Sequence, residues 1–463
     1  MDSPNRAQSD LVTAVCPPCA QRVLPPPSRG LRYGGPLALV VAVGLYVVEF
    51  TRWPAYVTQI DLMVYRFGGQ RLLGGLDLYS TGIFGSHRVL LFTYTPFAAL
   101  SFTPLNMFSL PWLRAVSLGA AAALLTYTVQ RVLTALGMPR HRQWWTLTAL
   151  LVGMCLWLEP VRYSIQLGQI NLTILAVVVA DMLGPPQRKW AGLGIGLVAG
   201  VKLTPAIFLV YLVLIGRRRA ALVGTATFLA TIAVGFVILP GDSATYWLGG
   251  KFDDPQRVSP DPAVSTSVRG LFLRLHCPAE AATVISLALA LLCLAVAVLA
   301  WRRGHPVLGL SLTGLASAAA SPFSWSHHWV WFIPLIVHLG HRGYVLGSRW
   351  ALCAAWALFA LIAGWLCSPR GRAPMPGLVA WRPGGLWNAL LPSGYLLVLL
   401  VAVLASVLWL RRNAPGSHPA SAAVPSTGAS KAAANSVPTR TGVRRRDELR
   451  AIDAHLPGCG AAE

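Results

Sequence analysis

The sequence contains few charged residues. Only 12% of its 463 residues are Asp, Glu, Lys or Arg, whereas 55% are hydrophobic, and the mean hydropathy is +0.57. So few charges cannot cover the surface of a water-soluble domain of this size. The composition therefore excludes an ordinary soluble globular protein and predicts an all-α polytopic membrane protein.

Acidic residues are scarcest, with 16 Asp and Glu against 38 Lys and Arg and a formal net charge of +22. In a soluble protein this excess of positive charge would suggest binding to nucleic acid. Here the basic residues lie in short clusters between apolar runs, which is the pattern of cytoplasmic anchoring in membrane proteins. We therefore expect membrane lipid as a partner and no nucleic acid.

Several familiar chemical motifs are also missing. Three of the eight cysteines, Cys155, Cys293 and Cys353, lie inside apolar runs, so a disulfide framework is not expected. The chain has no Rossmann GxGxxG after a strand, no HExxH, and no dense carboxylate cluster for a divalent ion. We therefore predict no cofactor and no metal site.

The two ends differ from the rest of the chain. Residues 1–33 have no apolar core, and residues 413–463 are rich in Ala, Ser, Pro and Thr and then basic. Such composition is typical of disordered segments. We predict two disordered cytoplasmic tails around a membrane domain at residues 34–412.

Apolar segments divide that membrane domain. If the basic clusters between them are all cytoplasmic, the chain crosses the membrane about twelve times with both termini inside. Several segments are shorter than the roughly 20 residues of a straight span, so broken helices are expected. The segments lie near residues 35–50, 112–131, 145–159, 170–184, 190–200, 203–215, 220–239, 281–300, 306–321, 329–341, 350–366 and 392–410.

This topology requires two irregular segments. The run "LLFTYTPFAALSFTPL" must re-enter or cross twice, with Pro96 and Pro104 as breakers. The run at residues 190–216 has basic residues at both ends and is predicted to form two half-length helices that meet at Lys202. Because broken helices at membrane depth must line a cavity or be buried in protein, they indicate a site.

The polar residues that interrupt the apolar pattern collect on the extracytoplasmic side of this topology. Ionisable residues near a membrane are costly unless they are functional. We take as candidate site residues Asp61, Glu159, Gln169, Asn171, Lys202, Arg269, His327 and His328.

Each candidate has a functional and a structural interpretation. Asp61 is either a catalytic base at the membrane surface or a helix N-cap or partner of Arg66. Lys202 either holds a substrate phosphate or pairs with a lipid phosphate or a backbone carbonyl. The amides of "GQIN", residues 168–171, bind substrate or hold helices together. Glu159 and Arg162 could simply neutralise each other.

The adjacent histidines in "SPFSWSHHWVWF" do not suit a shared metal ion. Neighbouring residues on a helix point about 100° apart, whereas zinc ligands favour the i, i+4 spacing. An imidazole that donates a hydrogen bond to a phosphate oxygen fits better. One of the two histidines could instead be a packed structural residue.

Together these segments resemble glycosyltransferase family 87, over roughly residues 35–410. The resemblance rests on "DLMVY", "DLYS", "YTPFAALSFTPL", "GQIN", "GLGIGLVAGVKLTP" followed by "RRR", and, most specifically, "SPFSWSHHWVW". It implies a GT-C membrane fold and a polyprenyl phosphate mannose donor. It also implies a glycolipid or lipoglycan acceptor and an inverting α-1,2 transfer at the extracytoplasmic face of a bacterial plasma membrane.

In that family Asp61 matches the early acidic residue that serves as the base. Lys202, Gln169, Asn171 and the histidine pair match segments that line the donor and acceptor cavity. The stretch "STSVRG", residues 265–270, departs from the Asn-Gln-Ser-containing segment of many members, which bears on the roles of Ser267 and Arg269. A lipid flippase or transporter remains the alternative, since it would also contain broken helices and intramembrane polar residues.

Overall fold

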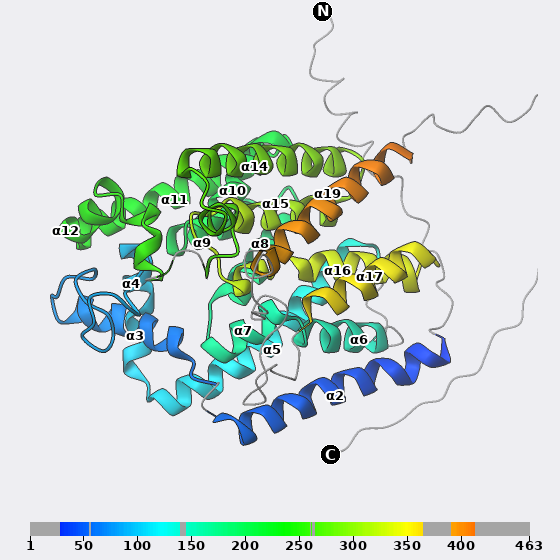
Figure 1. Cartoon of the computed structure of the whole chain (residues 1–463), viewed down its shortest axis with the longest axis horizontal. Coiled ribbons are helices and arrows are strands. Elements are labelled where there is room, and N and C mark those ends of the chain that lie inside the picture. Colours follow the sequence, from blue (N-terminus) through cyan, green and yellow to red (C-terminus); the bar gives the residue numbers. More distant parts are fainter. Residues whose placement is uncertain are drawn as a thin grey trace, which may run out of the picture. The chain divides into compact units, whose positions relative to one another are not determined.

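The computed structural model describes residues 28–54, 57–138, 145–259, 261, 264–363 and 390–412. Within these ranges the regular structure is helical, apart from two isolated β-bridges (Figure 1). Residues 29–33, predicted as part of the N-terminal tail, instead begin the first described helix. Ser28 caps this helix, and residues 1–27 and 413–463 of the two predicted tails lie outside the described residues.

The α-helices of the described residues follow one another along the chain, with the longer connections between α3 and α4 and between α12 and α13. They are α2 (Arg29–Arg52), α3 (Ile60–Leu73), α4 (Pro96–Phe102), α5 (Leu110–Ala135), α6 (Trp145–Leu156), α7 (Glu159–Leu167), α8 (Asn171–Met182), α9 (Leu193–Val201), α10 (Ile207–Leu214), α11 (Arg218–Ile238), α12 (Pro240–Ser243), α13 (Val268–Arg274), α14 (Ala279–Arg302), α15 (Pro306–Ala320), α16 (Phe332–Tyr344), α17 (Arg349–Ile362) and α19 (Gly394–Arg412).

Shorter helical turns connect several of them. Those that matter for the site are η2 (Thr103–Met107), η4 (Thr204–Ala206) and η9 (Ser326–Trp329). Each of the twelve predicted apolar segments overlaps a described helix, so the helical reading of those segments is confirmed.

Within the part of the chain that the structure describes, five helical segments are long and apolar enough to cross a membrane: α2, α5, α11, α14 and Leu391–Arg412. The pair α7 and α8 would make a sixth span, bent by 119°. Four shorter apolar helices have 10–17 residues. The chain is thus a helical membrane protein, and the count of about twelve crossings stays a prediction.

The predicted break at Lys202 is present. Helix α9 ends at Val201, Lys202 is extended with φ −139° and ψ 126°, and η4 begins at Thr204. The prediction for Pro96 and Pro104 was wrong in detail, because each lies in the first turn of a short helix, α4 and η2, and begins it instead of breaking one. Proline suits that position because its missing N–H would be unpaired there anyway.

Glycines at four-residue spacing bring α9 and α11 into close contact. A Cβ atom at Gly196 would lie 2.2 Å from the backbone oxygen of Gly224, and one at Gly200 would lie 2.2 Å from the Thr231 hydroxyl. Small residues at this spacing let helix backbones approach closely in a membrane. "GLGIG" is therefore a helix-packing motif, as the sequence indicated.

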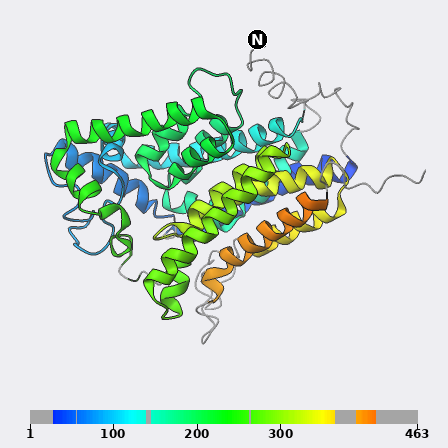
Figure 2. The ribbon, with the colours of Figure 1, turned by 90° about the horizontal axis from the view of Figure 1, so that it is seen from above.

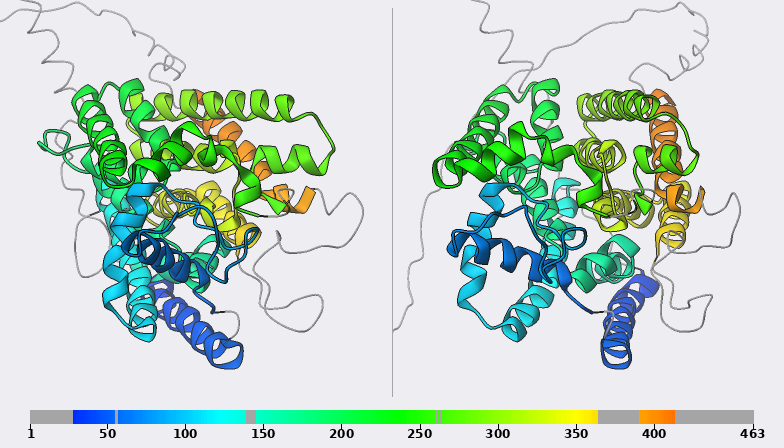
Figure 3. Two further views of the ribbon diagram at one scale, coloured as in Figure 1. Left: turned by 90° about the vertical axis from the view of Figure 1, so that its left-hand side faces the viewer. Right: turned by 60° about the vertical axis from the view of Figure 1, so that its left-hand side comes forward.

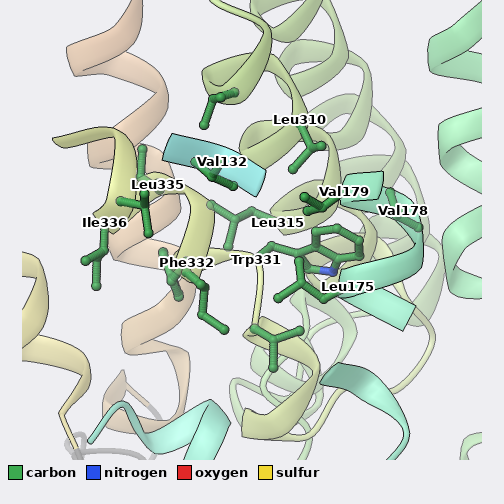
Figure 4. Close-up of a cluster of buried hydrophobic side chains, with 14 of the residues drawn as sticks. Val132, Leu175, Val178, Val179, Leu310, Leu315, Trp331, Phe332, Leu335 and Ile336 are labelled. Carbon is green, nitrogen blue, oxygen red and sulfur yellow. The ribbon is translucent and has the colours of Figure 1, made fainter. Parts of the chain in front are cut away.

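The other long helices also pack in pairs. Helix α14 runs beside α15 and α19, and α2 lies against α6 (Figures 2 and 3). The larger hydrophobic core contains residues of α5, α8, α15 and α16, including Val132, Leu175, Leu315 and Trp331 (Figure 4).

A second, smaller core lies around α3 and α4 and contains Tyr65, Tyr94 and Phe102. The Tyr65 and Phe102 rings stack with centroids 4.6 Å apart. Ile170, between α7 and α8, packs against both cores. The bend between these two helices is therefore where the two cores meet.

Candidate active site at the bend between α7 and α8

The bend depends on a glycine. Gly168 ends α7 in the left-handed conformation with φ 70°, and a Cβ atom there would lie 2.9 Å from that of Leu62. Only glycine adopts this conformation without strain and leaves room for α3. The bend directs the next two polar side chains, Gln169 and Asn171, to different partners.

Gln169 holds the candidate base. Its Nε2 atom donates a hydrogen bond to Asp61 Oδ2 at 2.6 Å, and its Oε1 atom accepts one from the Tyr65 hydroxyl at 2.9 Å. The Tyr65 hydroxyl in turn lies 3.0 Å from that of Tyr94. A side-chain amide donates through its nitrogen and accepts through its oxygen, so Gln169 links the carboxylate to the tyrosine pair.

The structural alternatives for Asp61 were wrong. The N-cap of α3 is Gln59, and Asp61 lies inside the first turn. The ion pairs found among the described residues do not include one between Asp61 and Arg66. Asp61 thus has a place in the site that neither capping nor ion pairing explains.

The protonation of Asp61 is set by its burial. Helix α3 is outside the candidate membrane spans. Burial raises the pKa of the Asp61 carboxyl to about 6, while the Gln169 hydrogen bond and the nearby charge of Lys202 act in the opposite direction. A carboxylate with a pKa near neutrality is ionised at pH 7 and is also a competent proton acceptor.

Asn171 holds the candidate cation. Its Oδ1 atom accepts a hydrogen bond from Lys202 Nζ at 2.9 Å, and its Nδ2 atom donates to the backbone oxygen of His327 at 2.9 Å. The Lys202 ammonium also lies 5.6 Å from the centre of the Tyr94 ring. The break between α9 and η4 thus places Lys202 beside the bend, close enough to act on Asp61.

His328 and Lys202 face each other at hydrogen-bonding distance. When the backbone N–H of Trp325 donates to His328 Nδ1, at 3.3 Å, the proton of a neutral imidazole is on Nε2. His328 Nε2 lies 3.1 Å from Lys202 Nζ. In that tautomer both groups are donors, and an acceptor beside them, such as a phosphate oxygen, satisfies both.

His327 has a different environment. Its side chain is buried, and neither ring nitrogen has a hydrogen-bond partner within the described residues. The ring stacks with Tyr163 at 6.3 Å and with Trp325 at 6.5 Å. Burial and the charge of Lys202 lower its pKa well below the usual value, so the imidazole is neutral and can both donate and accept.

A pocket adjoins this cluster. Thr204 and Ser317 add hydroxyl groups to it, and Trp331 belongs both to its wall and to the larger core of Figure 4. The pocket is lined by Asn171, Ile174, Thr204, Ser317, Ala318, His328, Val330 and Trp331.

Two predicted residues, Glu159 and Arg269, do not join the cluster. Glu159 interacts instead with Tyr395 and with Ser326, the first residue of η9. It does not neutralise Arg162 by direct pairing, because Arg162 donates to both carboxylate oxygens of Glu49 at 2.7 Å. That pairing corrects the expected Glu159–Arg162 partnership.

Arg269 is partly exposed and lies 3.7 Å from Asp253. The segment before it has another role. The Thr266 backbone N–H donates to the Ser324 oxygen at 2.7 Å, and the Trp329 indole donates to the Thr266 hydroxyl at 2.9 Å. Residues 265–267 thus support the histidine segment from behind.

Two residues of the site were missed from the sequence, Tyr65 and Tyr94. A signal for Tyr65 was available, because it follows Asp61 by four residues and therefore shares its helix face. Tyr94 begins the "YTPFAAL" motif but gave no positional signal. Both hydroxyls contact Gln169.

The metal prediction can be compared only with part of the chain. In the described ranges, no group of three or more His, Cys, Asp or Glu side chains could hold a metal ion. Metal independence of the reaction itself stays a prediction.

The fold and the site together define a class. This is a helical membrane protein in which a carboxylate and an ammonium group, held by neighbouring amides, face one cluster beside a pocket. That arrangement suits an enzyme with two substrates. The ammonium group would bind an anionic group on one, and the carboxylate would accept a proton from a hydroxyl of the other.

Comparison with known proteins gives the family. The family model of glycosyltransferase family 87 matches residues 92–322, a range that includes Gln169, Asn171, Lys202 and Arg269 but neither Asp61 nor the histidine pair. Relatives described below share at least 30% identity over most of their length. The chain belongs to glycosyltransferase family 87. It is therefore an enzyme of the glycosyltransferase class, and the transporter alternative is set aside.

Three relatives come from mycobacteria. A polyprenol-phosphate-mannose-dependent alpha-(1-2)-phosphatidylinositol mannoside mannosyltransferase of Mycobacterium tuberculosis is 30% identical, over 66% of this chain and 76% of its own. The protein of that name from Mycolicibacterium smegmatis is 32% identical, over 64% and 73%. A phosphatidylinositol pentamannoside mannosyltransferase of Mycobacterium tuberculosis with the same donor and linkage is 32% identical, over 86% and 91%. No solved structure matches the chain.

Proposed function

We propose that this enzyme transfers a mannosyl residue from polyprenyl phosphate mannose to a hydroxyl of a lipid-linked mannoside or mannan, forming an α-1,2 linkage. The names of the related enzymes support this donor, the α-1,2 linkage and a phosphatidylinositol mannoside acceptor. The observation that carries the proposal is the bend at residues 168–171, which brings a carboxylate and a cation to one cluster through Gln169 and Asn171.

Asp61 is the general base of the proposed reaction. The acceptor oxygen attacks the anomeric carbon of mannose, its proton passes to the Asp61 carboxylate, and the bond from that carbon to the phosphate oxygen breaks. Direct displacement on a β-linked donor inverts the anomeric centre and gives an α-linked product. The raised pKa of Asp61 suits a base that works close to neutral pH.

Lys202 and His328 hold the leaving phosphate. The Lys202 ammonium and His328 Nε2 lie 3.1 Å apart, and with the His328 proton on Nε2 both can donate to a phosphate oxygen that binds beside them. Negative charge that develops on the departing polyprenyl phosphate is stabilised most effectively by donors already in place. No strong general acid is then needed to protonate the leaving group.

The remaining cluster residues position the sugar. His327 offers two unpartnered ring nitrogens to hydroxyl groups, and the Tyr163 and Trp325 rings next to it offer apolar faces. Glu159 and Arg269, more distant from Asp61, are assigned to the acceptor side. The polyprenyl chain remains among membrane lipids.

In the proposed topology the protein has a GT-C-type fold with about twelve crossings of a bacterial plasma membrane. The site then opens to the extracytoplasmic face, and the two tails lie in the cytoplasm. Support comes from the basic residues at the helix ends away from the site, such as Arg217, Arg302 and Arg411.

The test is sugar transfer by purified protein in nanodiscs. Synthetic polyprenyl phosphate mannose, radiolabelled in the sugar, is offered with a panel of mannosylated lipids in the presence of a chelator. We expect an α-linked product from the wild type and a rate at least ~100-fold lower for Asp61→Asn, since general-base catalysis contributes ~10²–10⁴-fold.

Glu280→Gln is the matched control, because Glu280 is an exposed carboxylate in the first turn of α14. It should transfer sugar at the wild-type rate. Normal transfer by folded Asp61→Asn would rule out the base assignment. Folded wild type that transfers no mannose to any acceptor would rule out the proposed substrates.

A further inference from the structure

A second polar cluster lies at the opposite end of α15 and α16. Helix α15 begins next to His305 and runs toward the histidine segment of the site, and α16 returns from there to His341 and Arg342. Fifteen helical residues span about 22 Å. This distal cluster, consisting of His305, His338, His341, Arg342 and Trp409, is therefore separate from the candidate active site.

The cluster is assembled from three parts of the chain. Trp409 of α19 contacts both the His305 ring, at a centroid distance of 4.5 Å, and the Arg342 guanidinium, at 4.4 Å. His338 lies one helical turn before both His341 and Arg342 on α16, so its side chain neighbours each of theirs. The side chain of Arg303 holds the end of α19 by donating to the Leu410 oxygen.

These groups carry unused hydrogen-bonding capacity. His338 and His341 are 5% and 6% exposed, and the Nδ1 atom of each has no partner in the described structure. Buried polar nitrogens without a partner are uncommon and indicate a bound water, ion or ligand. The guanidinium of Arg342 stacks on Trp409, an arrangement that leaves its N–H groups available at the ring edge.

The electrostatic environment has one sign. The groups whose charges act on His305, His338 and His341 are Arg303, Arg342 and other histidines, without a carboxylate among them. At the candidate active site, by contrast, Lys202 acts on Asp61. Among the described residues no carboxylate forms an ion pair with this partly buried arginine, and a buried cation without such a partner favours an external counter-charge.

An apolar surface leads to this cluster. Leu397, Val401, Leu404 and Leu408 of α19 are each 48–65% exposed and recur at the spacing of one helix face, which ends beside Trp409. Such a stripe suits lipid chains, and tryptophan is typical of the level of lipid headgroups. The surroundings therefore favour a lipid over a soluble anion.

We propose that the distal cluster binds the phosphate of an anionic phospholipid, whose acyl chains lie along the exposed face of α19. The Arg342 guanidinium forms charge-assisted hydrogen bonds with phosphate oxygens, and the buried imidazoles of His338 and His341 donate further ones. The site recognises the phosphate and the negative charge, and basic pockets between helices at a membrane surface suit that recognition.

The experiment measures lipid binding by native mass spectrometry on the full chain in detergent. Phosphatidylglycerol, phosphatidylcholine and inorganic phosphate are titrated separately against wild type, Arg342→Gln and Arg349→Gln. Arg349 is the matched control, because it is an exposed arginine that begins α17 at the same end of α16. We expect wild type to bind phosphatidylglycerol ahead of phosphatidylcholine, and Arg342→Gln to bind it roughly tenfold or more weakly.

Each outcome of these titrations either supports or overturns the lipid site. Equal weakening by Arg349→Gln would mean a general attraction to basic helix ends and would overturn a specific site. Equal affinity for phosphatidylcholine would do the same. Inorganic phosphate that displaces the lipid at comparable concentration would replace the lipid with a soluble anion. If Arg342→Gln does not fold, Arg342→Lys replaces it, because lysine keeps the charge but lacks the planar guanidinium. The proposal would be contradicted if Arg342→Lys bound phosphatidylglycerol as tightly as wild type and wild type showed no preference for that lipid over phosphatidylcholine.

Discussion

Two networks of charged side chains in this membrane protein differ in whether the opposite charges bind each other directly. In the first, Arg162 and Glu49 pair directly at 2.7 Å, and both side chains are at most 1% exposed. Gln166 also donates to Glu49, and the Arg162 guanidinium lies 4.6 Å from the centre of the Trp157 ring. Although Arg162 Nε and Nη1 have no hydrogen-bond partner, both oxygens of the carboxylate are occupied.

In the second network, Asp61 and Lys202 do not bind each other. An amide stands at each charge, Gln169 at the carboxylate and Asn171 at the ammonium. A neutral partner holds a charged side chain in place but leaves its charge uncompensated, so an ionic substrate can still be attracted to it. The direct pair fastens α2 to α7, whereas the pair held apart by amides is available for chemistry.

Substitution of Lys202 should show the largest effect in this comparison. With Lys202→Met, kcat/KM for the lipid-phosphate donor should fall by roughly 10²–10³, because the leaving phosphate loses its fixed positive charge. Lys189→Met removes an exposed lysine before α9 and should leave the rate unchanged. A rate for Lys202→Met within twofold of wild type would show that the ammonium has only a structural role.

Glu49→Gln should give the opposite pattern. Loss of the carboxylate leaves the buried Arg162 charge without its partner, so the free energy of unfolding should fall by about 3–5 kcal/mol. Sugar transfer per folded molecule should be retained. Thermal unfolding in nanodiscs measures the change, with Glu280→Gln, an exposed glutamate in α14, as the control. Unchanged stability in Glu49→Gln would contradict the structural role.

The pH dependence of transfer tests whether Asp61 must be ionised. Its pKa is raised to about 6, so the carboxylate that accepts the proton is depleted below that pH. We expect kcat/KM to fall about tenfold per pH unit well below 6. An acid limb near pH 4, where an unperturbed aspartate titrates, would mean that Asp61 is not buried in the free enzyme.

Gln169→Leu should have the smallest effect, and that effect should appear mainly on the acid side of the pH profile. The hydrogen bond from Gln169 stabilises the ionised form of Asp61, so its loss should raise the pKa of the carboxyl further. The acid limb should move to higher pH, with a severalfold loss of rate near pH 6 and little change at pH 8. Equal loss at every pH would point to a role in binding alone.

Much of this arrangement could be predicted from the sequence. Long apolar runs must be helical in a membrane, and a lysine followed by Thr-Pro inside such a run indicates a break. Those two arguments located the helices and Lys202. Polar residues in an apolar background then pointed to Asp61, Gln169, Asn171 and the histidine pair, all of which lie around one bend.

The rest could not be predicted, for physical reasons. Arg162 and Glu49 are 113 residues apart, and local spacing carries no information about a pair formed by tertiary packing. Glu159, only three residues away, was therefore the wrong partner. Arg269 is a cationic side chain like Lys202, and the sequence did not distinguish the two. In the structure Arg269 lies on α13 beside Asp253 and not at the bend. The number of crossings depends on how the short helices sit in lipid, which hydrophobicity alone does not fix.

The most direct test compares Asp61→Asn and Glu49→Gln side by side. Both variants replace a buried or partly buried carboxylate by its isosteric amide, and both are assayed for sugar transfer per folded molecule and for thermal unfolding. The account predicts that Asp61→Asn keeps its stability and loses transfer, while Glu49→Gln loses stability and keeps transfer. Transfer by folded Asp61→Asn at the wild-type rate would contradict the assignment of Asp61 as the base.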